Sequence, residues 1–155
     1  MRLEDFTFVV TTFKSEDIIF NCLKSIPKNC NKIVVENSNN LELKKKLEKT
    51  FDNLKCYIMD ENLGYGTANN FGINKSETDY VFILNPDVKL AENTLIDLSE
   101  ILKNENFSIA APIDINQREK VNFNTNKAIE VEFVKGFAMI LNKKKIENFF
   151  FDENI

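Results

Sequence analysis

Two segments decide the fold: 56–73 reads Cys-Tyr-Ile-Met-Asp-Glu-Asn-Leu-Gly-Tyr-Gly-Thr-Ala-Asn-Asn-Phe-Gly-Ile, and 80–88 reads Tyr-Val-Phe-Ile-Leu-Asn-Pro-Asp-Val. The apolar runs Lys55–Met59 and Tyr80–Leu84 are rich in β-forming residues, which predicts two buried parallel strands. A short helix is expected to begin near Thr67. In an open α/β sheet, ligands bind outside the carboxyl ends of the strands. The polar residues that follow both runs therefore predict one shared site.

The residues after the two strands have the chemistry of a binding site. Glycines such as Gly64 let a ligand approach the backbone, and Asn70 can donate and accept hydrogen bonds without adding charge. Asp87 supplies a hard oxygen ligand of the kind that Mg²⁺ or Mn²⁺ prefers. Ordinary loops have the same composition, so Asp87 could instead be a turn residue after Pro86.

Outward from this stretch, the chain predicts a single α/β domain. The expected strands are Phe6–Val10, Lys32–Glu36, Ile109–Pro112, Val131–Val134 and Phe137–Leu141. Helices are expected between Ser15 and Pro27, along the apolar stripe from Leu43 to Leu54, over Asn93–Lys103 and from Lys143 towards Phe150. The βαβαβ alternation implies right-handed crossovers. Ile113–Glu130 is polar and without periodicity, which predicts a variable loop region.

Composition narrows the function. The chain has 155 residues, 43% hydrophobic and 28% charged, as expected for one globular domain. A net charge of −4 argues against broad nucleic-acid binding. The chain contains no histidine, which excludes Ser-His-Asp and Cys-His catalysis within it. Three cysteines without metal-ligand spacing predict reduced, buried thiols in a cytoplasmic protein. We expect neither a signal peptide nor a membrane span.

The motif Asn62-x-Gly64-Tyr65-Gly66-x-Ala68-x-Asn70-x-Gly72-Ile73, followed by Leu84-Asn85-Pro86-Asp87-Val88, resembles the inverting glycosyltransferases of family 2. More narrowly, it resembles the rhamnosyltransferase-like branch that builds bacterial surface polysaccharides. The similarity runs from about Phe6 to the last residue. It implies a GT-A-like, Rossmann-like, mainly parallel sheet flanked by helices in a single domain, 1–155. The nucleotide-sugar-binding half would cover roughly 1–112, and the acceptor half would start at 113.

The resemblance also assigns site residues. The matching donor-binding positions are Thr11, Phe13, Glu36, Asn62, Gly64, Asn70, Asn85 and Asp87, and Asp87 would hold the divalent metal, Mg or Mn. Several alternatives stay open. Phe13 could be a core residue, Glu36 could be a loop glutamate facing water, and the Asn62–Asn70 stretch could simply connect a strand to a helix with asparagine as a cap. Gly136 matches a glycine before a strand of the acceptor half, or it could mark a bulge.

No catalytic residue is identified. In the resembling family an aspartate of an acidic pair follows a Phe-Asp-Glu segment and acts as general base. Here Phe151-Asp152-Glu153 matches that lead-in, and the base is expected beyond Ile155. We therefore expect a chain truncated before the catalytic-base region. The expected function is transfer of a sugar from a nucleoside-diphosphate sugar to a hydroxyl of a bacterial surface polysaccharide, with inversion. The alternative is a catalytically incomplete nucleotide-sugar-binding or interaction domain.

The resemblance also suggests partners. The acceptor would be a glycan or a lipid-linked glycan, with at most peripheral membrane contact at the inner face of the membrane. The aromatic run Phe149–Phe151 could support a homodimer. A nucleotidyltransferase with a similar sheet is disfavoured, because Thr11–Lys14 stands where a Gly-rich basic loop would follow the first strand.

Overall fold

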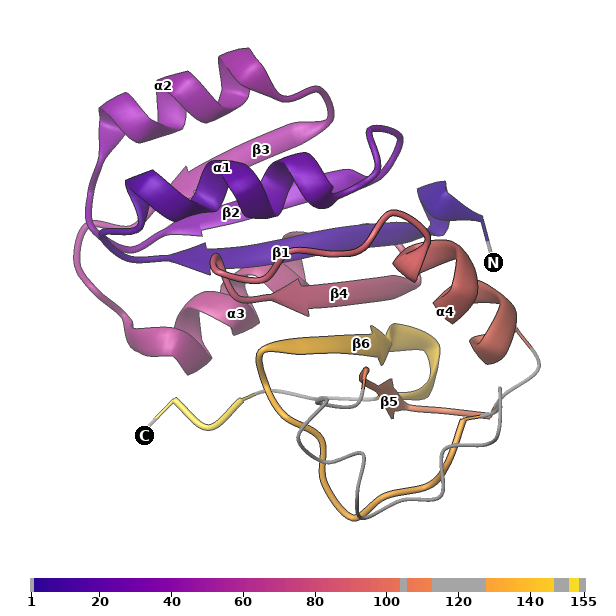
Figure 1. The fold of residues 1–155 in the computed structure, drawn as a ribbon. Helices are drawn as coiled ribbons and strands as arrows, with labels where there is room; N and C mark the ends of the chain where they lie inside the picture. Colours follow the sequence, from indigo (N-terminus) through magenta and orange to yellow (C-terminus); the bar gives the residue numbers. More distant parts are fainter. Residues whose placement is uncertain (1, 104–105, 113–127, 147–150, 154–155) are drawn as a thin grey trace.

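The computed structural model describes residues 2–103, 106–112, 128–146 and 151–153. Its centre is a six-stranded sheet with the order β3-β2-β1-β4-β6-β5 (Figure 1). The first four strands are parallel, whereas β6 runs antiparallel to β4 and β5 antiparallel to β6. The predicted α/β fold with a mainly parallel sheet is confirmed. The strands are β1 Phe6–Thr12, β2 Asn31–Glu36, β3 Leu54–Ile58, β4 Tyr80–Leu84, β5 Ile109–Ala110 and β6 Ala138–Asn142.

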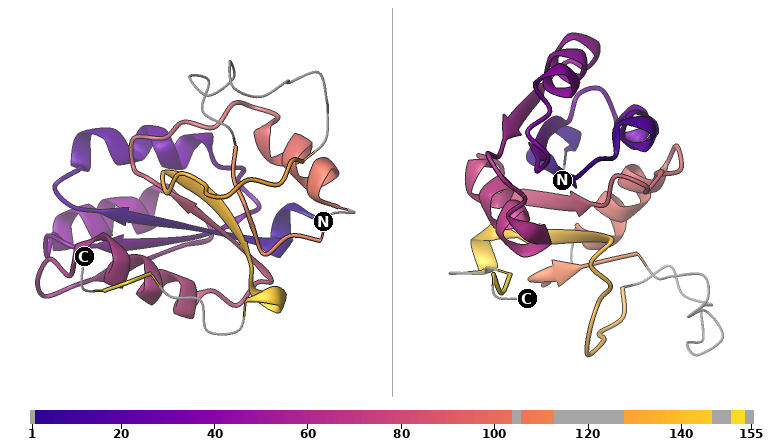
Figure 2. Two further views of the ribbon diagram at one scale, coloured as in Figure 1. Left: turned by 90° about the horizontal axis from the view of Figure 1, so that it is seen from below. Right: turned by 90° about the vertical axis from the view of Figure 1, so that its left-hand side faces the viewer.

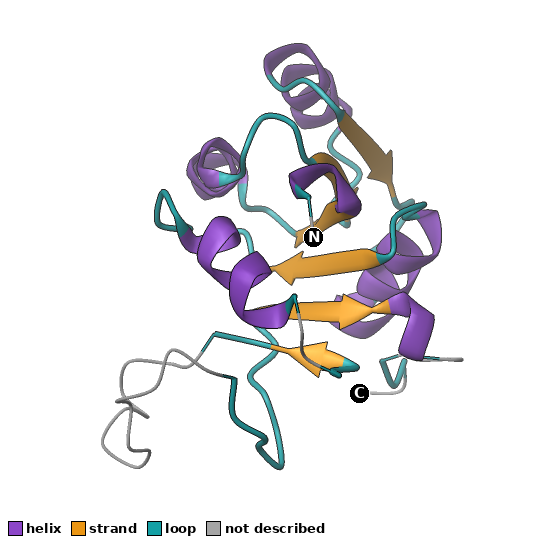
Figure 3. Ribbon diagram, turned by 90° about the vertical axis from the view of Figure 1, so that its right-hand side faces the viewer, coloured by secondary structure: helices purple, strands orange, loops and turns teal. Residues whose placement is uncertain are grey.

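Helices cover both faces of the sheet, as Figures 2 and 3 show. The α-helices are α1 Glu16–Ser25, α2 Leu41–Thr50, α3 Gly64–Lys75 and α4 Thr94–Leu102, with short 3₁₀ turns η1 Leu3–Asp5 and η3 Lys143–Lys145. Helices α1, α2 and α4 pack on one face through a core that includes Phe8 and Phe82. Helix α3 packs on the other face, against Val9 and Ile83. Alternate strand residues therefore feed two cores.

The chain order explains the two layers. The units β1-α1-β2-α2-β3 step outward along one face, and α3 then returns across the other face to β4 beside β1. Close packing on this return is possible because Gly72 has no side chain. A Cβ there would lie 2.4 Å from Val9 Cγ1. The three cysteines are buried and form no disulfide, as the sequence predicted.

Some boundaries differ from the sequence prediction. Helix α3 begins at Gly64 rather than near Thr67, and β1 continues to Thr12. The predicted strand Val131–Val134 is wrong: this segment forms no strand, and Val131 and Phe133 are 49% and 70% exposed. A short run of apolar residues does not show whether a segment pairs with a sheet, and here β6 pairs with β4 and β5 instead. Of the helix predicted from Lys143 towards Phe150, the described residues form only the 3₁₀ turn η3. Phe149 and Phe150 lie outside the described residues.

Candidate functional site

The strand order of the sheet reverses between β1 and β4. The chain leaves β1 through α1 on one face of the sheet, and it enters β4 from α3 on the opposite face. In Figure 1 the arrowheads of β1 to β4 all point to the same edge, on the left. A crevice at the carboxyl ends of two such strands is where open α/β sheets bind ligands.

Buried polar atoms without protein partners gather at this edge. Among the described residues they are Thr12 Oγ1, Asn37 Oδ1, Asn85 Oδ1 and Asn142 Oδ1. The first three stand at or directly after the carboxyl ends of β1, β2 and β4, and only Asn142 lies at the opposite end of the sheet, paired with Tyr80. Buried polar groups are normally hydrogen-bonded, so such a cluster points to a ligand or ordered water. Sequence reasoning missed Thr12 and Asn37, although each follows a buried apolar run.

Glu36 ends β2 with its side chain fully buried. Its carboxylate accepts hydrogen bonds from Ser38 N at 2.9 Å, from Asn40 N at 2.6 Å and from the Ser38 hydroxyl. Asn40 in turn caps α2, because its Oδ1 accepts from Leu43 N at 2.9 Å. The alternative of a glutamate facing water is therefore wrong. Glu36 holds the loop between β2 and α2, and its direct contact with a nucleotide stays a prediction.

The glycine-containing loop between β3 and α3 is shaped by its backbone. Gly64 has φ +77°, a conformation that L side chains rarely adopt. Its N–H donates to Asn62 Oδ1 at 3.1 Å, and its carbonyl accepts from Asn37 Nδ2 at 3.2 Å. We call Asn62–Gly66 the donor loop. Asn37 thus ties the donor loop to the end of β2.

Thr11 and Asn70 lie close to this loop but already have protein partners. The Thr11 hydroxyl donates to Asn69 Oδ1 at 3.1 Å, and Asn69 Nδ2 donates to Tyr65 O at 2.9 Å. Asn70 is 2% exposed, and its carboxamide binds the C-terminal segment at Phe151. Both residues therefore stabilise α3 through contacts within the chain. Their roles in donor binding stay predictions.

The turn before β6 joins the donor loop to the end of β4. Tyr65 Oη donates to Gly136 O at 2.7 Å, and Asn85 N donates to Phe137 O at 2.9 Å. Burial raises the pKa of Tyr65, so its hydroxyl stays protonated as a donor. Gly136 therefore belongs to a turn at the site, directly before β6.

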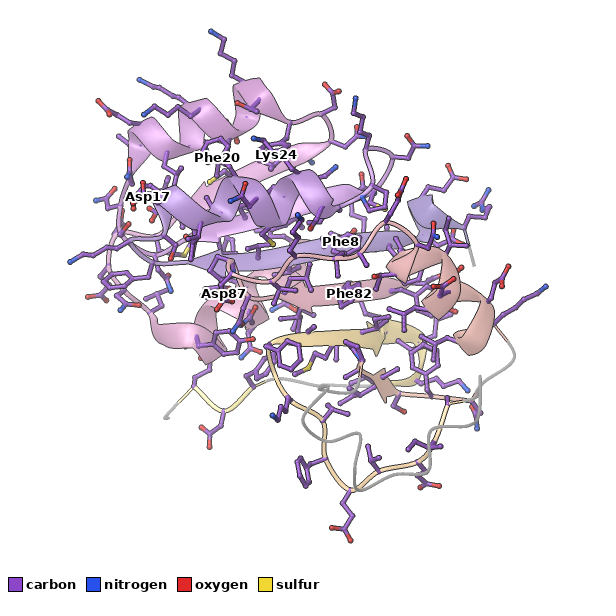
Figure 4. The ribbon with its side chains drawn as sticks, viewed as in Figure 1. Phe8, Asp17, Phe20, Lys24, Phe82 and Asp87 are labelled. Atoms are coloured by element: carbon purple, nitrogen blue, oxygen red, sulfur yellow. The ribbon has the colours of Figure 1, made fainter. Side chains whose placement is uncertain are left out.

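Asp87 follows β4 with an exposed side chain, at the carboxyl edge of the sheet (Figure 4). Cys22 of α1 lies beside this strand end, because its thiol donates to Asn85 O at 3.5 Å. Burial, and secondly the negative charge of Asp87, raise the pKa of Cys22 to about 12. The carboxylate of Asp87 is therefore near α1, while Asn85 connects the same strand end to the turn at Phe137.

Phe13 is 44% exposed directly after β1, so the alternative of a core residue is wrong. Lys14 Nζ lies 5.2 Å from the centroid of its ring, and Lys14 has φ +50°. An exposed aromatic ring at the mouth of the site can stack on a flat ligand.

The donor atoms at the end of β4 fit a hard cation only in part. No group of three or more His, Cys, Asp or Glu side chains forms a metal cluster in the part of the chain that the structure describes. Asp87 supplies one carboxylate, and the unpartnered Oδ1 of Asn85 supplies a second hard oxygen two residues away. These oxygens suit Mg²⁺ or Mn²⁺ when a ligand provides the remaining ones.

The fold and the polar edge define a class: an α/β protein with the GT-A architecture of nucleotide-sugar transferases. Two solved structures with this architecture resemble it. The mannosyltransferase PcManGT of Pyrobaculum calidifontis aligns with a TM-score of 0.76 at 16% identity, covering 90% of this chain and 45% of its own. S. aureus TarS 1-349 aligns with a TM-score of 0.58 at 24% identity, covering 67% of this chain and 34% of its own.

The sequence matches Glycosyl transferase family 2 over residues 7–154, and the chain belongs to this family. It is 28% identical over 142 residues to the low-salt glycan biosynthesis hexosyltransferase Agl10 of Haloferax volcanii. It is also 28% identical over 135 residues to a teichoic acid poly(glycerol phosphate) polymerase of Staphylococcus epidermidis. These matches cover 89% and 82% of this chain, but only 45% and 19% of the two relatives. Among the described residues, no helix is long and apolar enough to cross a membrane.

Proposed function

We propose that the chain binds a nucleoside-diphosphate sugar and forms the donor side of a glycosyltransferase that modifies a hydroxyl of a surface glycan. Family membership over residues 7–154 supports the reaction class. The observation that carries the donor site is the set of unpartnered buried atoms on Thr12, Asn37 and Asn85 at the edge where β1 and β4 meet. The names of two relatives, in glycan and teichoic acid biosynthesis, support a surface glycan as acceptor.

The nucleotide would lie along the carboxyl ends of the strands. The exposed ring of Phe13 is available to pack on the base, and the N-terminus of α3, where Leu63 provides no side-chain cap, suits the diphosphate. Glu36 acts on the nucleotide through the loop that it holds. S. aureus TarS has been solved with UDP-GlcNAc, and PcManGT with GDP-Man and Mn²⁺.

Asp87, with Asn85 beside it, would hold the divalent cation together with oxygens of the diphosphate. When bound, such a cation stabilises the negative charge on a diphosphate leaving group. A single protein carboxylate makes a weak site by itself. Metal and nucleotide should therefore bind together rather than in sequence.

Several finer statements belong to the same proposal. The rhamnosyltransferase-like branch, inversion at the anomeric carbon and a division near residue 112 into donor and acceptor halves follow from the family resemblance. We also infer a cytoplasmic site of action at the inner face of the membrane, where lipid-linked acceptors are available. A homodimer is a further candidate assembly.

Titration calorimetry with UDP, dTDP and GDP, each with and without MnCl₂, tests the donor site. We expect binding of at least one nucleotide, and stronger binding with Mn²⁺. If none of the three produces heat or shifts the melting temperature, the donor-site proposal is wrong.

The second candidate is a nucleotide-sugar-binding domain without transferase activity. It is kept because Asp152 and Glu153 match only the segment that precedes the family's general base, and Glu153 Oε1 accepts a hydrogen bond from Asn70 Nδ2 at 2.8 Å within the chain. Donor hydrolysis or transfer distinguishes the two candidates. A chain that binds a donor but releases no nucleotide from it would be a binding domain.

A further inference from the structure

The C-terminal segment Phe151–Glu153 lies beside the first half of α3, as Figure 1 and the left view of Figure 2 both show. Asn70 connects the two. Its Nδ2 donates to Phe151 O at 3.0 Å and to Glu153 Oε1 at 2.8 Å, and its Oδ1 accepts from Phe151 N at 2.8 Å. Both ends of one carboxamide are therefore used by residues more than eighty positions away in the sequence.

Helix α3 is also shaped for this segment. A Cβ at Gly66 would lie 2.6 Å from Asp152 O and 3.3 Å from Phe151 Cβ, so only glycine leaves room for the backbone. The rings of Tyr65 and Phe151 meet edge to face, with centroids 5.8 Å apart. Three residues in the first two turns of α3 thus contact the segment: Gly66 by its steric fit, Tyr65 by its ring and Asn70 by its hydrogen bonds.

The same two turns carry the donor loop. Gly64 begins α3 and is held by Asn62 and Asn37, one turn and a half before Asn70. The contacts that hold Phe151–Glu153 on α3 therefore also fix the position of this segment relative to the donor loop.

We propose that Asn70 is a positioning residue: it holds Phe151–Glu153 against the helix that follows the donor loop, and it does not hold the nucleotide. The clasp formed by Tyr65, Gly66 and Asn70 sets the carboxylates of Asp152 and Glu153 at a fixed place beside the donor loop. Its relevance to transfer rests on the proposed function, but the clasp itself is defined by contacts within the chain.

Hydrogen exchange of the Phe151 amide in the whole chain tests the clasp. Asn70→Leu removes all three hydrogen bonds at similar side-chain size, and we expect exchange to be at least about fivefold faster because each bond contributes roughly that factor. Asn74→Leu makes the same change at an exposed position of α3 and should leave Phe151 unchanged. Affinity for UDP or GDP with Mn²⁺ should stay within about twofold in both variants.

Unchanged exchange in Asn70→Leu would overturn the proposal, and so would a larger loss of nucleotide affinity, which would return Asn70 to the nucleotide site. If the unmodified chain binds no nucleotide, the proposed function fails, while the exchange measurement still decides the clasp.

Three further variants separate positioning from general stability. Asn70→Asp places a carboxylate against Glu153 and should speed exchange of Phe151, and adding Glu153→Gln should slow it again because the new amide can donate to that carboxylate. Gly66→Ala should displace the segment without lowering the melting temperature, because alanine favours the helix more than glycine. Absence of any rescue, or a lower melting temperature with faster exchange throughout α3, would show a merely structural role.

Discussion

The ends of β2 and β4 lie on the same edge of the sheet but are built in opposite ways. At the end of β2, the buried carboxylate of Glu36 has hydrogen-bond donors on both oxygens. At the end of β4, Asn85 Oδ1 is buried without a partner, and Asp87 is exposed. The strand-terminal carboxylate of Glu36 is thus hydrogen-bonded within the chain, whereas the Oδ1 atom of Asn85 is not.

This difference separates scaffold from ligand site. A buried carboxylate is costly unless it is fully hydrogen-bonded, and removal of its partners or of the group itself destabilises the fold. A buried acceptor without a partner already costs free energy, which a ligand can recover by supplying the missing donor. We therefore expect changes at Glu36 to affect stability, and changes at Asn85 and Asp87 to affect binding.

The largest expected effect is that of Glu36→Ala. It leaves the N–H groups of Ser38 and Asn40 without acceptors and should lower the free energy of unfolding by about 3 kcal/mol. For a chain of this size, that corresponds to a melting temperature lower by about 10 °C. Glu42→Ala, at an exposed position in the first turn of α2, is the control and should change stability little. A thermal melt of Glu36→Ala that matches the unmodified protein would contradict the scaffold role.

The next effect is that of Asp87→Asn, which keeps the shape of the side chain but removes its charge. Metal-dependent affinity for the nucleotide should fall at least about tenfold, as expected when a metal ligand is weakened. Stability should be unchanged, because Asp87 is exposed. Titration calorimetry with UDP or GDP measures the nucleotide affinity with and without MnCl₂, and a thermal melt measures stability. Equal affinities for the two proteins would remove Asp87 from the metal site.

Much of this contrast could be anticipated from sequence. The runs at Phe6, Lys32 and Tyr80 predicted the parallel strands, since buried strands are continuous and apolar. Polar residues after Tyr80–Leu84 predicted a site at that strand end. Exposure of Phe13 and burial of Glu36 could not be predicted, because both depend on which way a side chain turns where a strand ends.

The long-range partners could not be predicted either. Asn70 belongs to the sequence motif, but its hydrogen bonds to Phe151 and Glu153 join parts of the chain that no local pattern connects. Val131–Val134 shows the reverse error. Its apolar residues satisfy the sequence rule for a strand, yet the segment is not among the strands of the sheet.

A third prediction uses Cys22 as a probe of the β4 end. Burial and the charge of Asp87 raise the pKa of Cys22 from 9.0 to about 12. The thiol therefore favours the folded state fully below pH 9, and this contribution is lost as pH rises from 9 towards 12, because the unfolded thiol ionises first. The loss should be about 1.4 kcal/mol per pH unit.

Urea unfolding of the unmodified protein and of Cys22→Ala between pH 8 and about pH 10.5 isolates this loss as the difference between the two slopes. In Asp87→Asn the pKa of Cys22 should be lower, because the second cause of the rise is removed. Parallel slopes for the unmodified protein and Cys22→Ala would show that the thiol does not have a raised pKa.

The smallest expected effect is that of Asn85→Ala, and it tests the comparison most directly. The substitution removes packing, which lowers stability, but it also removes a buried acceptor without a partner, which raises stability. The free energy of unfolding should therefore change by less than about 1 kcal/mol. Asn142→Ala is the matched control: Asn142 also has a buried Oδ1 without a partner, but at the opposite end of the sheet. Nucleotide affinity in the presence of MnCl₂ should fall about threefold to tenfold in Asn85→Ala, as expected for the loss of one polar contact, and stay constant in Asn142→Ala. Equal affinities in both variants would mean that an unpartnered acceptor at the carboxyl edge is no different from one at the other edge, and the ligand site would lose its structural basis.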